Sequence, residues 1–335
     1  MAEYKGIKGF KVQYLSADPS NPIIGQTWYN STSKDLKYTG ATAAGAWATG
    51  GSMGTARTEL AGAGTQTAGL AISGTLTPTA NVQNATEEYN GATWTSGGTV
   101  VTARRTLAAA GTQTAAIAFG GSSPSVPGPT GATEGYDGNS WTSSNSLNTA
   151  RNTLGGCGTQ TAGLAFAGSI PPNSTATEEY DGTSWATSPG SLNTARNGLA
   201  GAGTQTAGLA FAGQVNPTPT VTGATEEYNG ATWTSSNSLN TAREKLAGAG
   251  IQTAALAFGA QTPGPTFTSA ATEEYDGTSW TTVASLSTAR RSLAGAGTQT
   301  AGLAFGGDPD GASLTGATEE WLGAGSPQTK TVTVS

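Results

Sequence analysis

The chain has 335 residues with a formal net charge of −6, and it contains no histidine, one cysteine, 50 glycines and only 11% charged residues. The lack of histidine excludes His-based catalytic triads and His-ligated metal centres. No lysine occurs between Lys37 and Lys245, so the acidic chain offers no basic patch for phosphates and nucleic-acid binding is not expected.

The first part of the chain, residues 1–40, differs from the rest. Ala17–Pro22 favours turns, and Gly25–Asn30 is typical of a strand that enters a turn. The opening MAEYKGIKGF is not apolar enough for a signal peptide, and no later stretch is long and apolar enough for a membrane span, so we expect no membrane insertion. We interpret residues 1–40 as an attachment segment; a cap over the edge of the following domain is the alternative.

The remainder is built of repeats. A TAR triplet begins at Thr55, Thr102, Thr149, Thr194, Thr241 and Thr288, which gives steps of 47, 47, 45, 47 and 47 residues by subtraction. A G-[TI]-Q-T-A block keeps the same register. Copies at so even a period predict a repeat architecture.

Each copy is expected to form four short strands. In one copy Leu199–Gly203 is small and apolar, and Ala207–Gly213 alternates large and small residues, which is typical of a strand with one thin face. The Pro-rich segment Gln214–Gly223 cannot continue a sheet, because proline lacks the N–H donor. Ala224–Tyr228 and the stretch at Trp233 supply the last two strands.

The last two strands of a copy are joined at an Asn-Gly or Asp-Gly dipeptide. Both residue types tolerate positive φ, so these dipeptides predict hairpin turns. They are Asn90–Gly91, Asp137–Gly138, Asp181–Gly182, Asn229–Gly230 and Asp276–Gly277.

Four features of the copies are shared with a known repeat: Phe305–Gly306–Gly307 at the end of a second strand, the Tyr275–Asp276 pair, Trp280, and the following Arg290. With these features, residues 41–322 resemble an array of kelch repeats. Kelch repeats have roughly 50 residues and form the blades of β-propellers. The resemblance implies a propeller but no particular activity.

The copies do not begin and end in phase. Trp47 precedes the first TAR without a full unit, whereas Thr288–Gly307 and Ala317–Trp321 supply only three strands at the far end. We therefore predict an all-β fold, a six-bladed kelch-like β-propeller whose last blade takes its fourth strand from Trp47. Leu36–Tyr38 is the rival for a place in that blade. The expected domains are the attachment segment at 1–40, the propeller at 41–322 and a C-terminal tail at 323–335.

Two residue types recur once per copy beside a Glu-rich third strand. They are Arg57, Arg104, Arg151, Arg196, Arg243 and Arg290, and Trp47, Trp94, Trp141, Trp185, Trp233 and Trp280. We interpret each Arg as the partner of a Glu at a blade junction and each Trp as a packing residue; an Arg ring that binds anionic glycan is the alternative. Gly135 replaces the second Glu of one copy, so that copy is expected to rely on Glu134. Cys157 stands where other copies have Ala, which predicts a buried small residue.

The loop after the second strand varies between copies, while the turns hardly change. In an up-and-down blade these loops share one face with the TAR segments, and loops on a rigid scaffold often carry recognition. Drift in unconstrained loops is the alternative. The candidate ligand-binding residues on the loops are Asn81, Asn173, the Asn216–Pro217 pair, Phe267 and Asp310.

No catalytic constellation stands out, because the Glu pairs recur in nearly every copy whereas an active site is a single irregular group. We expect no enzyme activity, no catalytic residues and no cofactor. Asp308–Gly311 has oxygen donors but is too short a pattern for a calcium loop, so no metal site is expected. A glycosidase needs only two carboxylates and remains an alternative.

The segment from Asn21–Pro22 through Gly25–Gln26 and Trp28–Thr32 to Leu36–Lys37 resembles a short module of phage tail-fibre and other virion proteins. The ATEEYDG…W…TAR repeats likewise resemble predicted proteins of aquatic bacteriophages. These resemblances imply a virion protein made in the host cytoplasm, in which a tail-fibre or receptor-binding component recognises host surface polysaccharide. Residues 1–40 would contact other virion proteins, and a homo-oligomer remains open. The alternatives are an architectural capsid-decoration or collar-fibre protein and a polysaccharide depolymerase.

Overall fold

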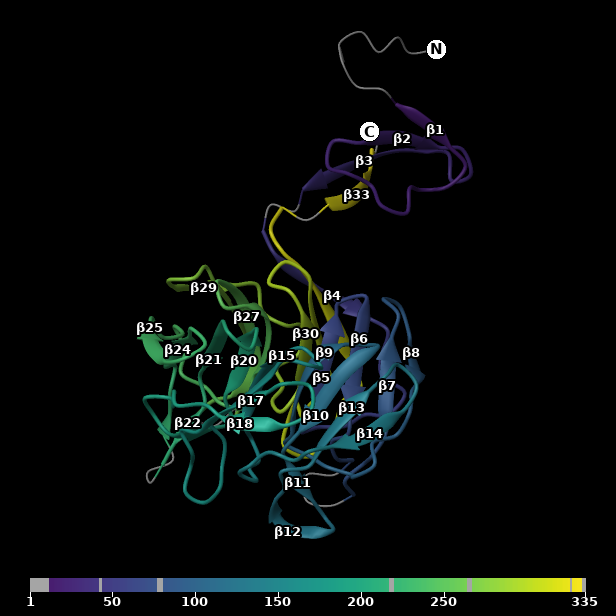
Figure 1. Cartoon of the computed structure of the whole chain (residues 1–335). Helices are drawn as coiled ribbons and strands as arrows, with labels where there is room; N and C mark the ends of the chain where they lie inside the picture. Colours follow the sequence, from purple (N-terminus) through teal and green to yellow (C-terminus); the bar gives the residue numbers. More distant parts are fainter. Residues whose placement is uncertain are drawn as a thin grey trace, which may run out of the picture. The chain divides into compact units, whose positions relative to one another are not determined.

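The computed structural model describes residues 12–41, 44–76, 81–216, 220–263, 267–325 and 327–332, and within these ranges the chain is all-β (Figure 1). The predicted fold class is confirmed at this level. The chain divides into two compact units, one of Met1–Ala46 with Leu322–Ser335 and one of Trp47–Trp321. In the described part of the chain, no helix is long and apolar enough to cross a membrane.

The smaller unit is a four-stranded sheet that uses both ends of the chain. Its order is β1 (Gln13–Leu15), β2 (Thr27–Asn30), β3 (Asp35–Ala41) and β33 (Pro327–Thr331). β1 is parallel to β2, and the other pairs are antiparallel. The segment expected as a separate C-terminal tail thus contributes an edge strand to the N-terminal sheet.

Asp18 connects the strands of this unit. Its carboxylate accepts hydrogen bonds from Trp28 Nε1 at 3.0 Å and Asn30 Nδ2 at 2.7 Å, and it pairs with Lys37 Nζ at 2.7 Å. The bond from Lys37 and the two neutral donors lower the pKa of Asp18 to about 2. A single exposed carboxylate therefore holds the loop before β2 against both β2 and β3.

The larger unit consists of four-stranded antiparallel sheets, one for each repeat. We number them by their first strands. Sheet 1 is β5 (Ala61–Thr65), β6 (Ala68–Ile72), β7 (Thr86–Tyr89) and β8 (Trp94–Ser96), and sheet 2 is β9 (Ala108–Thr112), β10 (Ala115–Phe119), β13 (Thr133–Tyr136) and β14 (Trp141–Ser144). Sheet 3 is β15 (Gly155–Gly158), β16 (Gly163–Phe166), β17 (Thr177–Tyr180) and β18 (Trp185–Thr187), and sheet 4 is β20 (Ala200–Gly203), β21 (Gly208–Phe211), β24 (Thr225–Tyr228) and β25 (Trp233–Ser236). Sheet 5 is β26 (Ala247–Ile251), β27 (Ala254–Gln261), β28 (Thr268–Tyr275) and β29 (Trp280–Val283), and sheet 6 is β30 (Ala294–Gly297), β31 (Gly302–Phe305), β32 (Thr318–Leu322) and β4 (Ala46–Gly50).

Sheet 6 combines strands from distant parts of the sequence. β4, which carries Trp47, lies beside β32, as the sequence predicted for its partner Ala317–Trp321. The rival segment Leu36–Tyr38 lies in β3 of the smaller unit. The first strands contact one another in the order β5, β9, β15, β20, β26, β30 and again β5. The succession returns to its start, which is a β-propeller-like arrangement.

The recurring tryptophans link neighbouring sheets, as expected for packing residues. Each indole Nε1 donates to a threonine hydroxyl on the third strand of the preceding sheet, at 2.8–3.0 Å. The pairs are Trp94–Thr318, Trp141–Thr86, Trp185–Thr133, Trp233–Thr177, Trp280–Thr225 and Trp47–Thr272. The same rings also pack on aromatic residues, as Trp233 does on Phe166 at 5.0 Å and on Tyr228 at 5.0 Å.

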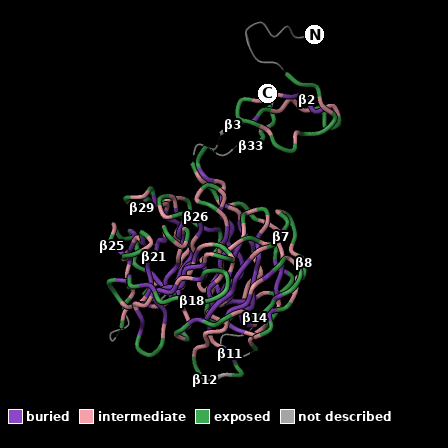
Figure 2. The backbone as a smooth tube through the Cα atoms, in the orientation of Figure 1, coloured by how far each residue is buried: buried purple, intermediate pink, exposed green. Residues whose placement is uncertain are grey.

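The core lies between the sheets, so both faces of the second strands are buried. Leu209, Ala210 and Phe211 in succession are 0% exposed. In Figure 2 buried residues follow the strands of the larger unit and exposed residues lie mainly on its loops and on the smaller unit. Cys157 is buried and unpaired, as predicted, and burial raises the pKa of its thiol to about 12.

The Asn-Gly and Asp-Gly turns work differently from the prediction. Only the glycine has positive φ, for example 93° at Gly138, while Asp137 uses its side chain. Asp137 Oδ1 accepts hydrogen bonds from the backbone N–H groups of Asn139 at 2.8 Å and Ser140 at 2.7 Å. The Asn or Asp is therefore selected as a hydrogen-bond acceptor rather than for the left-handed conformation.

Candidate functional site

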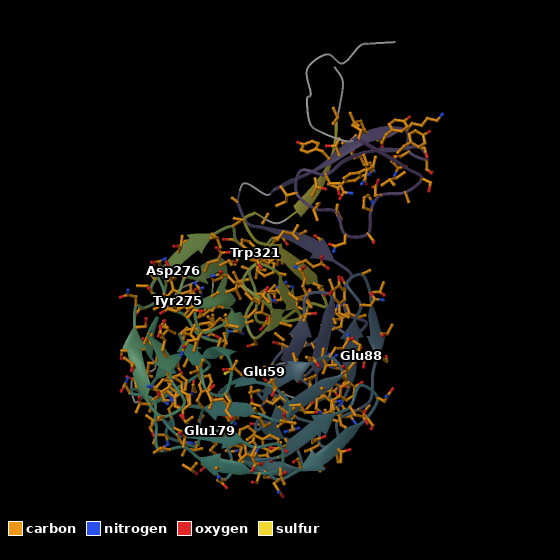
Figure 3. All side chains as sticks on the ribbon, turned by 45° about the horizontal axis from the view of Figure 1, so that its top comes forward. Glu59, Glu88, Glu179, Tyr275, Asp276 and Trp321 are labelled. Carbon is orange, nitrogen blue, oxygen red and sulfur yellow. The ribbon has the colours of Figure 1, made fainter. Side chains whose placement is uncertain are left out.

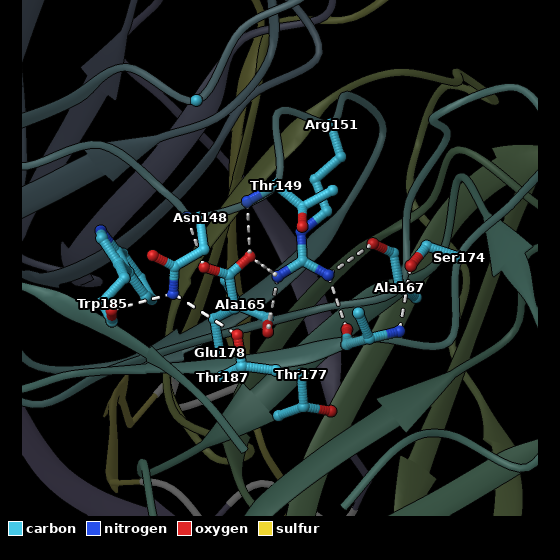
Figure 4. A network of polar contacts seen from close by, with 12 residues as sticks. Asn148, Thr149, Arg151, Ala165, Ala167, Ser174, Thr177, Glu178, Trp185 and Thr187 are labelled. Atoms are coloured by element: carbon cyan, nitrogen blue, oxygen red, sulfur yellow. Dashed lines mark hydrogen bonds and ion pairs between the residues drawn. The ribbon is translucent and has the colours of Figure 1, made fainter. Parts of the chain in front are cut away.

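The recurring arginines are buried structural residues. Arg151 donates from Nη1 to the carbonyls of Ala167 at 3.2 Å and Ala176 at 2.6 Å, and its Nη2 lies 3.0 Å from Glu178 Oε1 (Figure 4). Glu178 also accepts the N–H of Asn148 at 2.6 Å. The ion pair therefore holds the segment that enters a sheet against the third strand of that sheet.

The same ion pair forms in every repeat, at 2.6–3.0 Å, so the predicted Arg–Glu pairing is confirmed. Its expected place at a junction between two blades is wrong, because each Glu belongs to the sheet that its Arg leads into. The pairs are Arg57–Glu87, Arg104–Glu134, Arg151–Glu178, Arg196–Glu226, Arg243–Glu273 and Arg290–Glu319. Each pair lies within one repeat and uses the first Glu, so the Gly135 copy is no exception in this respect. All six arginines are 0% exposed, which rules out the alternative of an Arg ring that binds a glycan.

The variable loops and the TAR segments share one face, as predicted. The residue after each recurring Arg forms a β-bridge or a short ladder with the first residue of the variable loop. The pairs are Thr58–Thr75, Arg105–Ser122, Asn152–Ser169, Asn197–Gln214, Glu244–Gln261 and Arg291–Asp308. Two of the loops contain further strands, β11 (Ser122–Ser123) with β12 (Val126–Pro129) and β22 (Gln214–Val215) with β23 (Thr220–Val221), and β22 also pairs with β19 (Arg196–Asn197).

A closed circle of backbone hydrogen bonds lies at the centre of this face. We call its residues the mouth ring: Glu59, Thr106, Thr153, Gly198, Lys245 and Ser292. Each N–H donates to the carbonyl of the preceding member at 2.7–2.9 Å, and Glu59 closes the circle by donating to Ser292. Figure 3 places Glu59 near the centre of the surrounding sheets.

The mouth ring is held in a conformation that favours glycine. Its five non-glycine members have φ between 49° and 56°. Left-handed backbone costs an L-residue about 1–2 kcal/mol, which the surrounding structure must offset. Such strain recurs at functional sites, and here the side chains differ from copy to copy, so the mouth ring is a candidate binding element.

Six leucines, Leu60, Leu107, Leu154, Leu199, Leu246 and Leu293, lie beneath the mouth ring and are each 5–7% exposed. The mouth ring and these leucines line a pocket of about 110 Å³. A second cavity of about 260 Å³ is lined by the Leu-Ala-Gly segments at the first strands of all six sheets. The mouth pocket thus has an apolar floor and a polar rim.

Charged residues around the mouth are held by ion pairs and hydrogen bonds on two sides. On one side Arg105 pairs with Glu59 at 3.1 Å. On the other side Gln261 Oε1 accepts from Lys245 Nζ at 3.0 Å and Arg291 Nη1 at 2.8 Å, while Gln261 Nε2 donates to Glu244 Oε1 at 3.0 Å. Burial raises the pKa of Glu244, against the opposing effects of Lys245 and Arg291.

The predicted ligand-binding residues have different surroundings. Asn81 is exposed and accepts a hydrogen bond from Gln83 Nε2 at 2.8 Å. Asn173 is 8% exposed, donates to Gln214 O at 3.1 Å and accepts from Asn197 Nδ2 at 2.8 Å, so both its amide atoms are engaged.

The remaining candidates lie on the loops of sheets 4, 5 and 6. Phe267 is 57% exposed, and its neighbour Thr268 donates to Pro309 O at 3.0 Å, which brings the Phe267 loop to the loop of Asp310. Asp310 Oδ1 accepts a hydrogen bond at 2.6 Å from the backbone N–H of Ser313 in the same loop. Of the Asn216–Pro217 pair, the asparagine is exposed in a turn and the proline lies outside the described residues.

The Asp308–Gly311 segment is engaged in an ion pair. Asp308 Oδ2 lies 3.1 Å from Arg291 Nη2, and its Oδ1 accepts the N–H of Gly311 at 2.5 Å. Across the described ranges, no group of three or more His, Cys, Asp or Glu side chains is placed to hold a metal ion.

Sequence reasoning missed the mouth residues. The two positions after each recurring Arg read Thr58–Glu59, Arg105–Thr106, Asn152–Thr153, Asn197–Gly198, Glu244–Lys245 and Arg291–Ser292. They vary in charge and size between two nearly constant residues, Arg and Leu. An alignment of the six copies would therefore have marked these two positions as variable residues within a constant segment. Comparison with the models of known protein families and with curated proteins gives no match for this chain.

Proposed function

We propose that this chain is a six-bladed kelch-like β-propeller and a virion structural protein of a bacteriophage, and that the mouth ring and the variable loops recognise a host surface glycan. One observation carries the binding role. The repeats are nearly identical where they build the sheets and differ in charge where they surround the mouth. A constant scaffold with one varied face suits recognition.

The smaller unit would attach the protein to other virion proteins. It contains several exposed large apolar side chains, Val12, Tyr14, Ile23 and Ile24, at 51–75% exposure. Several exposed large apolar side chains in so small a unit suit an interaction surface. Its net charge also differs, because Lys5, Lys8, Lys11, Lys34, Lys37 and Lys330 outnumber Glu3, Asp18 and Asp35, which gives +3 against −9 for the rest of the chain.

The test of the binding role uses purified protein to compete with particles for host cells. Arg105→Ala combined with Arg291→Ala removes two mouth cations, and we expect competition to weaken by about tenfold or more, because charge-assisted hydrogen bonds are strong in a partly buried site. Thr206→Ala with Thr253→Ala, exposed on the repeated turns, is the matched control and should compete like the parent. Equal competition by a folded mouth variant would reject this face as the receptor site.

An architectural role, in capsid decoration or a collar fibre, is the second candidate, and the exposed apolar residues of the smaller unit favour it. Labelled antibody on purified particles separates the two. Label at the tail supports receptor binding, and label over the capsid supports decoration. The proposal includes no enzyme activity, so the protein should release no reducing sugar from host envelope polysaccharide. Release of reducing sugar would show instead that the protein is a polysaccharide depolymerase.

A further inference from the structure

Neighbouring sheets are linked by a repeated tyrosine–glutamate hydrogen bond, separate from the Arg–Glu pair. A buried tyrosine at the end of a third strand donates to the second Glu of the preceding sheet at 2.5–2.6 Å. The pairs are Tyr136–Glu88, Tyr228–Glu179, Tyr275–Glu227 and Tyr89–Glu320. Burial first, and then the glutamate, raise the pKa of each of these tyrosines to about 12.

A serine adds a second bond at two of these junctions. Ser188 Oγ lies 2.5 Å from the hydroxyl of Tyr228, and Ser236 Oγ lies 2.5 Å from that of Tyr275. Since the tyrosine proton is directed to the glutamate, the serine is the donor in this second bond. The full junction is therefore a chain from serine to tyrosine to carboxylate.

The junction between sheets 2 and 3 lacks the carboxylate. Gly135 stands in the place of the second Glu, and Tyr180, which is 3% exposed, bonds to Ser144. In the described part of the chain, no carboxylate hydrogen-bonds to the Tyr180 hydroxyl. Either hydroxyl can be the donor in the Tyr180–Ser144 bond. A carboxylate at the missing position would accept the Tyr180 proton, and Ser144 would then donate to Tyr180 as Ser188 does to Tyr228.

The space of the missing side chain is open. A Cβ placed on Gly135 would meet no atom closer than Gln160 Nε2 at 3.7 Å. A pocket of about 320 Å³ lies here, lined by Gly135, Ser144, Gln160 and Tyr180 together with the exposed Thr142 and Ser143. Figure 3 labels Glu88 and Glu179, the residues that take this position in the adjacent sheets.

We propose that the Gly135 pocket binds the carboxylate of an acidic sugar, in the place that Glu88 and Glu179 carboxylates take in the adjacent sheets. Tyr180 donates to the carboxylate, and Thr142, which lies opposite Gly135 in the pairing of β13 with β14, offers its hydroxyl to a sugar hydroxyl. The lining includes Asp137 and no basic side chain, so we expect a single uronic acid to bind only in the range of about 1 mM. The site does not depend on the mouth ring or on the proposed function.

The test is a titration of the full chain with glucuronate and, separately, with glucose, in which ligand-observed NMR measures binding. Glucuronate should bind and glucose should bind at least about tenfold more weakly, because glucose lacks the charged acceptor. Gly135→Glu restores the internal carboxylate and should abolish glucuronate binding, whereas Gly135→Ala leaves the pocket open and should retain it. Gly135 lies in β13 without positive φ, so both side chains fit the backbone.

A reciprocal variant tests the assignment at another junction. Glu179→Gly should open an equivalent pocket at Tyr228, so the Glu179→Gly variant should bind two glucuronates. The double variant Glu179→Gly with Gly135→Glu should bind one, because its Gly135 pocket is filled. Binding to the folded Gly135→Glu variant as tight as to the parent, or equal binding of glucose, would overturn the proposal. Failure of mouth variants to change adsorption would leave it intact, because the two sites share no residue.

Discussion

Ala109 in sheet 2 packs against the buried cluster that contains Ile72 of sheet 1, and this pair replaces the Gly–Phe pair found at the other sheet boundaries. A Cβ on Gly156, Gly201, Gly248 or Gly295 would lie 2.6 Å from a ring atom of the phenylalanine in the preceding sheet, and on Gly62 it would lie 2.8 Å away. The shorter side chain of Ile72 leaves room for the methyl group of Ala109. The two positions are therefore coupled by packing.

A double-mutant cycle should show this coupling. Ile72→Phe places a ring against the Ala109 methyl, and we expect it to lower the free energy of unfolding by about 1–3 kcal/mol, as overpacking does. Adding Ala109→Gly recreates the pair of the other boundaries and should recover most of the loss. Urea denaturation of the four proteins measures the coupling energy. A double variant no more stable than Ile72→Phe alone would contradict this packing.

Arg104 and Arg105 are adjacent in sequence, but their replacement should lower stability by very different amounts. Arg104→Met leaves Glu134 buried without its cation, which should cost about 3–5 kcal/mol. Arg105 is 31% exposed in its side chain and pairs with the partly exposed Glu59, so Arg105→Met should cost within about 1 kcal/mol. Thermal unfolding of the two variants gives the comparison. Similar losses would show that the buried and exposed pairs do not differ in this way.

The smaller unit should be lost in acid. The pKa of Asp18 falls from its ordinary 3.8 to about 2 on folding. Its contribution is therefore present above pH 3.8 and is lost as the pH falls towards 2. We expect the Trp28 indole N–H resonance to shift to its unfolded position over this range. In Asp18→Asn the resonance should lack that transition, and an unchanged titration would exclude Asp18 as its cause.

The larger unit should lose stability in alkali. Tyr89, Tyr136, Tyr228 and Tyr275 have pKa values raised from 10 to about 12. Their folded-state protonation stabilises the fold fully below pH 10, and this contribution disappears as the pH rises through 12. Phenolate absorbance and circular dichroism should change together above pH 10. Ionisation of these tyrosines near pH 10 without unfolding would contradict their burial at the junctions.

The sequence by itself determined the parts that repeat. The TAR period, the strand pattern within one copy, the Arg–Glu pairs and the indole positions were all readable, because each follows from spacing within one repeat. The sequence only favoured Ala317–Trp321 as the partner of the Trp47 strand, because Leu36–Tyr38 also precedes Trp47 as a third strand precedes a fourth, and the structure decided between them. The hairpin prediction failed in its mechanism because a dipeptide does not show which of its two residues takes positive φ.

Only the tertiary structure decided the features that depend on residues far apart in sequence. The pairing of β33 with β3 joins the chain ends, the mouth ring takes one residue from each repeat, and the Gly135 pocket exists because Tyr180 of the next sheet faces a missing side chain. In each case the free energy comes from contacts between elements, whereas local patterns report only the preferences within an element.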